Sequence, residues 1–154
     1  MKIFLLLIFS IFHQSAAVPD LTQNQVNNAI HYWQHVMRLD DLEIYGEIVP
    51  LNELPKDTAG TSNCIMALGA CKIQVLQPND YSKLDHSIGD QKILDDIENT
   101  IVHELVHIRL RNLSDIYKTK TVECIISNQC MLAEEYVVVR LTSSIMEGRG
   151  SHLK

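Results

Sequence analysis

The feature of the sequence that most constrains its fold is an amphipathic segment that contains the motif HELVH at residues 103–107. Apolar residues recur in this segment at intervals of three and four, the spacing of one face of an α-helix. The pattern predicts a helix that begins between Asp90 and Asp96 and ends near Leu110. The apolar face of this helix consists of Leu94, Ile97, Ile101, Leu105 and Ile108.

Two histidines, His103 and His107, lie four residues apart on the predicted helix and away from its apolar face. Residues with this spacing stack one turn above the other, so both imidazoles can reach one ion at about 2.0–2.1 Å. Glu104 projects to the side, where a carboxylate is better placed as a general base than as a ligand. With 7 histidines in 154 residues, this motif is rare by chance. We therefore favour a zinc site over an exposed helix face that carries two histidines.

Two histidines rarely complete a zinc site, and the acidic residues downstream are Asp115, Glu123, Glu134 and Glu135. Residues 131–146 predict another helix, with an apolar arc of Met131, Val137, Val138, Leu141 and Ile145. Glu134 falls in the middle of this arc, where a carboxylate is costly unless it is paired or bound to a metal. We therefore prefer Glu134 as the third ligand and take Glu135 as the second choice. The alternative is an exposed Glu134, in solvent or paired with an arginine.

The first 17 residues have the composition of a signal peptide. Lys2 precedes an apolar run at residues 3–12, and the small residues Ser15 and Ala17 suit cleavage after Ala17. The run is short for a membrane span, so we expect cleavage rather than an uncleaved anchor. This predicts a secreted or periplasmic protein whose mature part, residues 18–154, is a single domain. The formal net charge of -6 argues against a nucleic-acid partner.

Four cysteines, Cys64, Cys71, Cys124 and Cys130, suit the oxidising compartment that export implies. We favour the local disulfides Cys64–Cys71 and Cys124–Cys130 over crossed pairings, because each pair brackets a short, turn-like segment. The first segment predicts a β-hairpin with Gly69 in its turn. A structural zinc site built from all four thiolates is less favoured, because the spacings are wider than those usual for such sites.

The rest of the pattern predicts an α+β domain. Residues 22–39 predict a helix in which His31 and His35 are ordinary helix residues rather than a metal pair. Residues 42–51 predict a strand, and residues 65–68 and 71–76 predict the two strands of the hairpin. After the last helix we expect a mobile tail.

The motif HELVH at residues 103–107, with a later helix that carries AEEYVVV, resembles the gluzincin class of zinc metallopeptidases. The short domain is similar to the minimal single-domain members, the minigluzincins. The resemblance implies a small zincin-like domain with an N-terminal helix, a small mixed sheet, the HExxH active-site helix and a C-terminal glutamate-bearing helix. Larger gluzincins carry an asparagine before the ligand glutamate and an acidic residue four positions after it. Here Ala133 and Val138 occupy those positions.

The resemblance also implies the hydrolysis of peptide bonds in a peptide or protein substrate. One Zn²⁺ per chain would be held by His103, His107 and Glu134, and Glu104 would be the general base for the zinc-bound water. A strand near residues 72–76 would form the upper rim of the cleft, where an extended peptide can pair with an exposed strand edge.

The oxyanion donor and the catalytic state remain open at this point. Tyr117 and His86 are possible oxyanion donors, together with Arg109 and Arg140. The alternative to an enzyme is a secreted non-enzymatic or latent zinc-binding module with the same fold, in which a residue such as His152 covers the metal. In either case we expect a monomer without membrane contact after signal cleavage.

Overall fold

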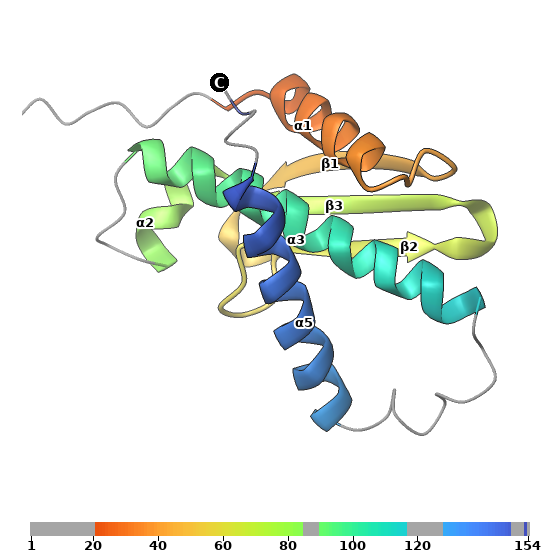
Figure 1. Cartoon of the computed structure of the whole chain (residues 1–154). Helices are drawn as coiled ribbons and strands as arrows, with labels where there is room; N and C mark the ends of the chain where they lie inside the picture. Colours follow the sequence, from red (N-terminus) through yellow and green to blue (C-terminus); the bar gives the residue numbers. More distant parts are fainter. Residues whose placement is uncertain (1–20, 85–89, 117–127, 149–152, 154) are drawn as a thin grey trace, which may run out of the picture.

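Helices and strands follow one another along the chain in the predicted order and form an α+β domain (Figure 1). The computed structural model describes residues 21–84, 90–116, 128–148 and 153. The principal elements are α1 (Gln23–Val36), β1 (Glu43–Val49), β2 (Gly60–Ile65), β3 (Ala70–Leu76), α3 (Asp90–Ile116) and α5 (Asn128–Glu147). A short helix, α2 (Tyr81–Leu84), and 3-10 turns at residues 51–53, 66–68 and 78–80 lie in the connections.

Several sequence predictions lie outside the described residues. They concern the signal peptide at residues 1–17, the residues Glu123 and His152, the possible oxyanion donors His86 and Tyr117, and the pairing of Cys124 with Cys130. In the part of the chain that the structure describes, no helix is long and apolar enough to cross a membrane.

The strands form a mixed sheet in the order β1–β3–β2. β1 pairs with β3 in parallel, and β2 pairs with β3 in the antiparallel direction. β3 is therefore the central strand, and both of its edges are already paired. The prediction that a strand near residues 72–76 forms the rim of the cleft is wrong for this reason, and β2 is the edge strand that packs against α3.

The predicted hairpin and its disulfide are confirmed. Cys64 and Cys71 are directly opposed in the antiparallel register and form a disulfide, with their Cα atoms 4.1 Å apart. Gly69 lies in the connection with a φ of 63°, a conformation that glycine adopts without steric cost. The first strand covers residues 60–65 rather than 65–68, because residues 66–68 form a 3-10 turn.

Helices α1 and α3 pack on one face of the sheet, where the core lies (Figure 1). A capping box between Thr22 and Gln25 starts α1, because it satisfies backbone N–H groups that have no partner within the helix. Val26, Ile30 and Trp33 point from α1 into the core and are completely buried. His31 and His35 are exposed on the outer side of α1, in agreement with their prediction as ordinary helix residues.

Helix α3 buries the predicted apolar face, with Ile97, Ile101, Leu105 and Ile108 fully buried and Leu94 half-buried. Glu98 is also fully buried in the core. Its Oε1 accepts a hydrogen bond of 2.7 Å from the indole of Trp33, and its Oε2 accepts one of 3.1 Å from the backbone N–H of Leu153. Leu153 is only 2% exposed, so the expected mobile tail is anchored at this residue.

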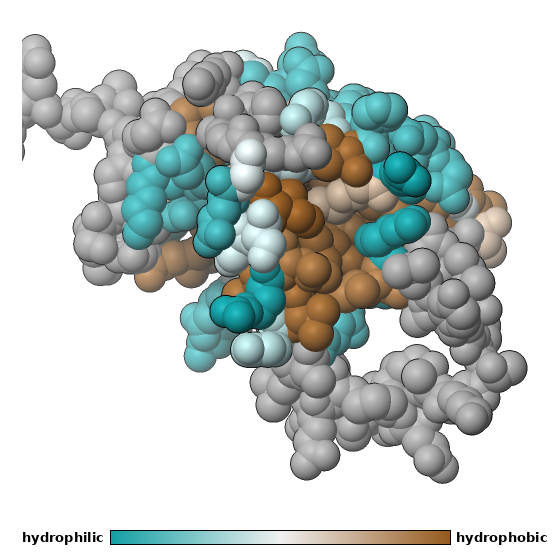
Figure 2. Space-filling model, in the orientation of Figure 1, coloured by the Kyte–Doolittle hydropathy of each residue, from teal (hydrophilic) through white to brown (hydrophobic). Residues whose placement is uncertain are grey.

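Helix α5 lies across α3 and is rotated relative to the prediction. Val138 and Thr142 are buried against the domain, while Ile145 and Met146 are half-buried. The exposed apolar side chains, which gather over this part of the molecule in Figure 2, are Tyr136, Val137, Val139 and Leu141. Glu135 precedes Val138 by three residues and Thr142 by seven, so it lies on the side of α5 that faces the domain, although its side chain remains 50% exposed. The prediction included two of these exposed residues, Val137 and Leu141, in the core-facing arc, and this error placed Glu134 at its centre.

Candidate metal centre

The histidines of the HELVH motif meet on one face of α3. His103 and His107 lie one helical turn apart, and their Nε2 atoms are separated by 3.2 Å. Their side chains are 23% and 13% exposed, respectively. They are therefore sheltered by the domain and still open to a pocket, as the helical wheel predicts.

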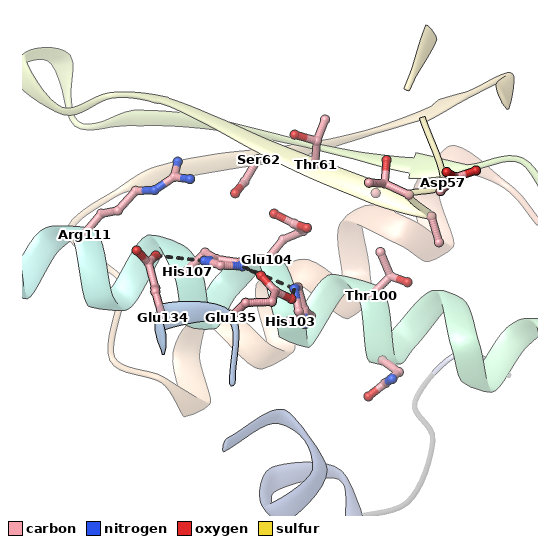
Figure 3. A pocket seen from close by; sticks show the side chains of 14 residues that line it. Asp57, Thr61, Ser62, Thr100, His103, Glu104, His107, Arg111, Glu134 and Glu135 are labelled. Carbon is pink, nitrogen blue, oxygen red and sulfur yellow. Dashed lines mark hydrogen bonds and ion pairs between the residues drawn. The ribbon is translucent and has the colours of Figure 1, made fainter. Parts of the chain in front are cut away.

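Helix α5 brings a carboxylate to both histidines. Oε1 of Glu135 lies 3.0 Å from Nε2 of His103, and Oε2 lies 3.2 Å from Nε2 of His107. His103, His107 and Glu135 therefore form a group whose possible ligand atoms lie within 4.8 Å of one another, close enough to hold a metal ion. Figure 3 shows the three side chains converging between α3 and α5. This group contains Glu135, the second choice of the sequence prediction, because the rotation of α5 directs Glu135 toward both histidines.

The ligand atoms of this group lie close enough together to hold one metal ion. A tetrahedral ion with ligands at about 2.0–2.1 Å holds neighbouring ligand atoms about 3.3 Å apart. The two Nε2 atoms here lie 3.2 Å apart, while Glu135 contacts the two histidines through different oxygens, Oε1 at 3.0 Å and Oε2 at 3.2 Å. Imidazole and carboxylate are also among the ligand types that zinc prefers.

Glu134 contacts the other nitrogen of His107. Its Oε1 lies 3.0 Å from Nδ1 of that imidazole. An ionised carboxylate only accepts hydrogen bonds, so a neutral imidazole that donates to Glu134 from Nδ1 would keep Nε2 available for a metal ion. Carboxylates commonly orient metal-binding histidines through the second ring nitrogen, and Glu134, the neighbour of Glu135, lies where it can do this for His107.

Glu104 lies beside the metal group and outside it. Its side chain projects from α3 toward β2 in Figure 3, and the residue is 8% exposed. It lines the same pocket as the two histidines and both glutamates of α5, a cavity of about 550 Å³. A carboxylate in this position faces the pocket, as the sequence predicts for a general base.

The roof of the pocket is formed by β2 and by the chain just before it, residues 57–62. Gly60 allows β2 to pack directly on α3, because a Cβ atom at this position would lie 2.4 Å from Cγ2 of Thr100. Ser62 is 9% exposed, and its hydroxyl oxygen is buried without a hydrogen-bond partner among the described residues. The pocket therefore has an edge strand above it and the metal group below it.

The arginines occupy different places from those that the sequence suggests. Arg109, a possible oxyanion donor, directs its guanidinium to the backbone carbonyl of Arg38 at 3.5 Å. Neither Arg109 nor Arg140 is among the residues that line the pocket. Arg111 does line it, and the sequence analysis missed this residue, although it follows His107 by four positions on the same helix.

Comparisons of the chain with protein-family models, with curated proteins and with solved structures give no match. The fold and the site define the class of protein at a coarse level: a small α+β domain with a disulfide and with a His/His/Glu group that could hold a metal ion.

Proposed function

We propose that this chain is a secreted zinc-dependent metallopeptidase that hydrolyses peptide bonds. The observation that carries the proposal is the group formed by His103, His107 and Glu135, placed in an open pocket beside the buried carboxylate of Glu104. The ligand set, two histidines from an HExxH helix and a glutamate from a later helix, is one that catalytic zinc sites use. The resemblance to gluzincins supports the same reaction.

When bound, zinc supplies Lewis acidity, which acidifies water and polarises a carbonyl group. Glu104 accepts the proton of the attacking water on its carboxylate and then delivers it to the leaving amine. Its burial next to the metal group favours this role, because proton transfer requires the carboxylate within hydrogen-bond reach of the reacting water. Glu134 holds the proton on Nδ1 of His107 and thereby orients the imidazole.

The edge strand β2 provides a means of binding an extended substrate. Its free backbone groups lie over the pocket, and a peptide can pair with them as an additional strand. The substrate carbonyl would then lie between β2 and the face of α3 that carries the histidines. This arrangement replaces the rim near residues 72–76 that the sequence predicts, since β3 has no free edge.

Export is part of the proposal and has separate support. The disulfide Cys64–Cys71 is of a kind that persists in oxidising compartments, and residues 1–17 have signal-peptide composition. N-terminal sequencing of the exported protein should read from Val18.

Zinc-loaded protein incubated with a peptide mixture, followed by mass spectrometry, tests the reaction. Glu104→Gln should bind zinc with unchanged affinity and lose at least ~10²-fold in cleavage rate, the usual scale for a lost general base. The exposed residue Glu147 lies on α5 and outside the pocket, so Glu147→Gln is the matched control and should cleave normally. Zinc uptake without cleavage of any peptide would favour the non-enzymatic or latent zinc-binding module instead.

A further inference from the structure

The tip of the β2–β3 hairpin, at one end of the molecule in Figure 1, carries only apolar side chains. Residues 65–70 have the sequence IMALGA, and no lysine, arginine, aspartate or glutamate occurs in residues 60–71. Ile65 is 60% exposed and Leu68 is 74% exposed, the highest value among the large apolar side chains that the structure describes. Apolar residues that are exposed singly need no explanation, whereas a contiguous apolar surface is typical of an interaction site.

The hairpin tip is fixed by contacts at its base and in its turn. The disulfide between Cys64 and Cys71 joins the two strands directly below the tip. The turn consists of the 3-10 segment at residues 66–68 and of Gly69, whose carbonyl oxygen accepts a hydrogen bond of 2.7 Å from the backbone N–H of Glu43. A surface that is already ordered loses little conformational entropy on binding, so more of the free energy of apolar burial is realised as affinity.

Strand β2 connects the hairpin tip to the pocket. Residues 57–62 form the roof of the pocket, and β2 continues from Ser62 to Ile65, where the tip begins. Three residues of extended chain span about 10 Å, so the tip begins about that far from the roof. β2 is the edge strand of the sheet, because β3 alone pairs with it. An extended chain that pairs with the free edge of β2 above the pocket is therefore led directly to the tip.

The charges around the hairpin tip favour a protein over a lipid membrane as its partner. Apolar segments that bind membranes are usually accompanied by basic residues, which attract anionic lipids. Here the start of β1 lies beside the turn, and its residues Asp41 and Glu43 are exposed. Lys72, the one lysine of β3, forms an ion pair of 3.0 Å with Glu47. A protein segment with apolar side chains is therefore the partner that best fits this surface.

We propose that the hairpin tip, residues 65–70, is a docking site for an apolar segment of a protein substrate. The inference rests on the proposed function, because the tip extends the cleft of the proposed hydrolase. β2 runs from the roof of the pocket toward the tip, and antiparallel pairing is the more stable arrangement per residue. A substrate that pairs with β2 in this way places its N-terminal part at the tip. The apolar segment therefore precedes the cleaved bond, by about three residues or more.

Peptide binding to zinc-loaded Glu104→Gln protein tests the docking site without requiring cleavage. The probes are fluorescent peptides of glycine, serine and threonine that carry a block of leucines at the N-terminal end, at the C-terminal end or nowhere. The peptide with the N-terminal block should bind about 10-fold more tightly than the peptide without leucines. This ratio requires only part of the free energy gained by burying one leucine side chain.

The double variant Ile65→Ser, Leu68→Ser should reduce the ratio to within about twofold. Both side chains are exposed, so the double variant should keep its thermal stability and its zinc affinity. The matched control is Val139→Ser, Leu141→Ser, because these residues of α5 are exposed and do not line the pocket. It should leave the ratio unchanged. A ratio near one for the N-terminal block, a ratio that persists in the double variant, or tighter binding of the C-terminal block overturns the docking site.

Two sedimentation measurements address the other occupants of an apolar surface. Co-sedimentation with vesicles of phosphatidylcholine and phosphatidylserine tests a membrane, and sedimentation velocity at rising protein concentration tests a second copy of the chain. The unsubstituted protein should neither bind the vesicles nor self-associate. Vesicle binding or self-association that is lost in the double variant assigns the tip to that partner and overturns the docking of a substrate.

Cleavage by the unsubstituted chain is measured separately, so that the two proposals can fail independently. Cleavage without a preference for the N-terminal leucine block retains the hydrolase and overturns the docking site. Tighter binding of that peptide without cleavage of any peptide retains the docking site and removes the hydrolase.

Discussion

Replacement of Glu135 by alanine should weaken zinc binding far more than replacement of its neighbour Glu134. The carboxylate of Glu135 lies 3.0 and 3.2 Å from Nε2 of His103 and His107. The carboxylate of Glu134 lies 3.0 Å from Nδ1 of His107, the nitrogen that points away from the metal group. In the proposed site, Glu135→Ala removes a ligand, and Glu134→Ala removes a group that orients a ligand.

The expected magnitudes follow from the coupling of zinc binding to folding. At a free zinc concentration about 100 times Kd, the ion stabilises the fold by about 2.7 kcal/mol. Loss of a group that orients a ligand lowers metal affinity by about 10- to 100-fold, so Glu134→Ala should retain about 0.4–1.4 kcal/mol of this stabilisation under the same conditions. Glu135→Ala leaves two histidines as ligands and should retain less than about 0.4 kcal/mol.

Urea unfolding with and without zinc measures the stabilisation, and competition with a chromophoric chelator measures the affinity independently. The matched control is Glu147→Ala, on the same helix and outside the pocket, which should behave as the unsubstituted chain. A larger loss in Glu134→Ala than in Glu135→Ala would refute the choice of ligand. Unchanged zinc affinity in both variants would refute the site itself.

Three further predictions concern the scaffold around the pocket. Replacing Cys64 and Cys71 together by alanine should lower the free energy of unfolding by about 2–3 kcal/mol in urea titrations, because the short loop they close becomes free in the unfolded chain. Gly60→Ala should cost about 1–3 kcal/mol and weaken peptide binding, because its Cβ would lie 2.4 Å from a methyl carbon of α3. The ion pair with Lys83 lowers the pKa of the Asp80 carboxyl below its usual value of 3.8. The ion pair therefore stabilises the fold fully above pH 3.8, and this stabilisation is lost as the pH falls through the lowered pKa. Asp80→Asn should therefore be less stable by about 1–3 kcal/mol at neutral pH, and unfolding titrations should find this difference shrinking below pH 3.8.

The sequence was sufficient for the parts of the fold that depend on local periodicity. The apolar face of α3 follows from a spacing of three and four residues, and burial of that face leaves His103 and His107 on the pocket side. The hairpin follows from a glycine between two cysteines, and direct opposition of Cys64 and Cys71 in the register then permits the disulfide. In each case the residues that decide the structure are close together in the chain.

The rotation of α5 could not be predicted in the same way. Its exposed residues include Val137 and Leu141, which are as apolar as the residues it buries. A helical wheel of α5 therefore shows no distinct polar face from which its orientation could be predicted. The packing of α5 against α3 selects the buried face, and this contact joins segments that are distant in sequence. The order of the strands is a similar case, because nothing local to residues 72–76 shows that β3 is paired on both sides.

The burial of polar groups could not be predicted from the sequence either. Glutamate usually lies on the exposed face of a helix. Glu98 instead lies in the core, where it accepts hydrogen bonds from Trp33 and from the backbone of Leu153. Each of these partners comes from a distant part of the chain, and a buried carboxylate is tolerated only when such donors surround it. The same reasoning explains why Arg111 was missed, since its position in the pocket depends on the strand above it.

The attachment of α5 to the domain and the affinity of the metal site are expected to be coupled. Among the described side chains of α5, Val138 and Thr142 are the buried ones, and the Thr142 hydroxyl has no hydrogen-bond partner there. Full burial of one valine contributes about 1.5–3 kcal/mol, similar to the roughly 2.7 kcal/mol from a zinc ion at 100 times Kd. In the proposed site, a zinc ion held partly by Glu135 would therefore add substantially to the apolar contacts of Val138, Ile145 and Met146 that hold α5 on the domain. A substitution that weakens zinc binding at Glu134 or Glu135 should loosen α5 selectively, because α1 and the sheet are held by a core in which neither glutamate takes part.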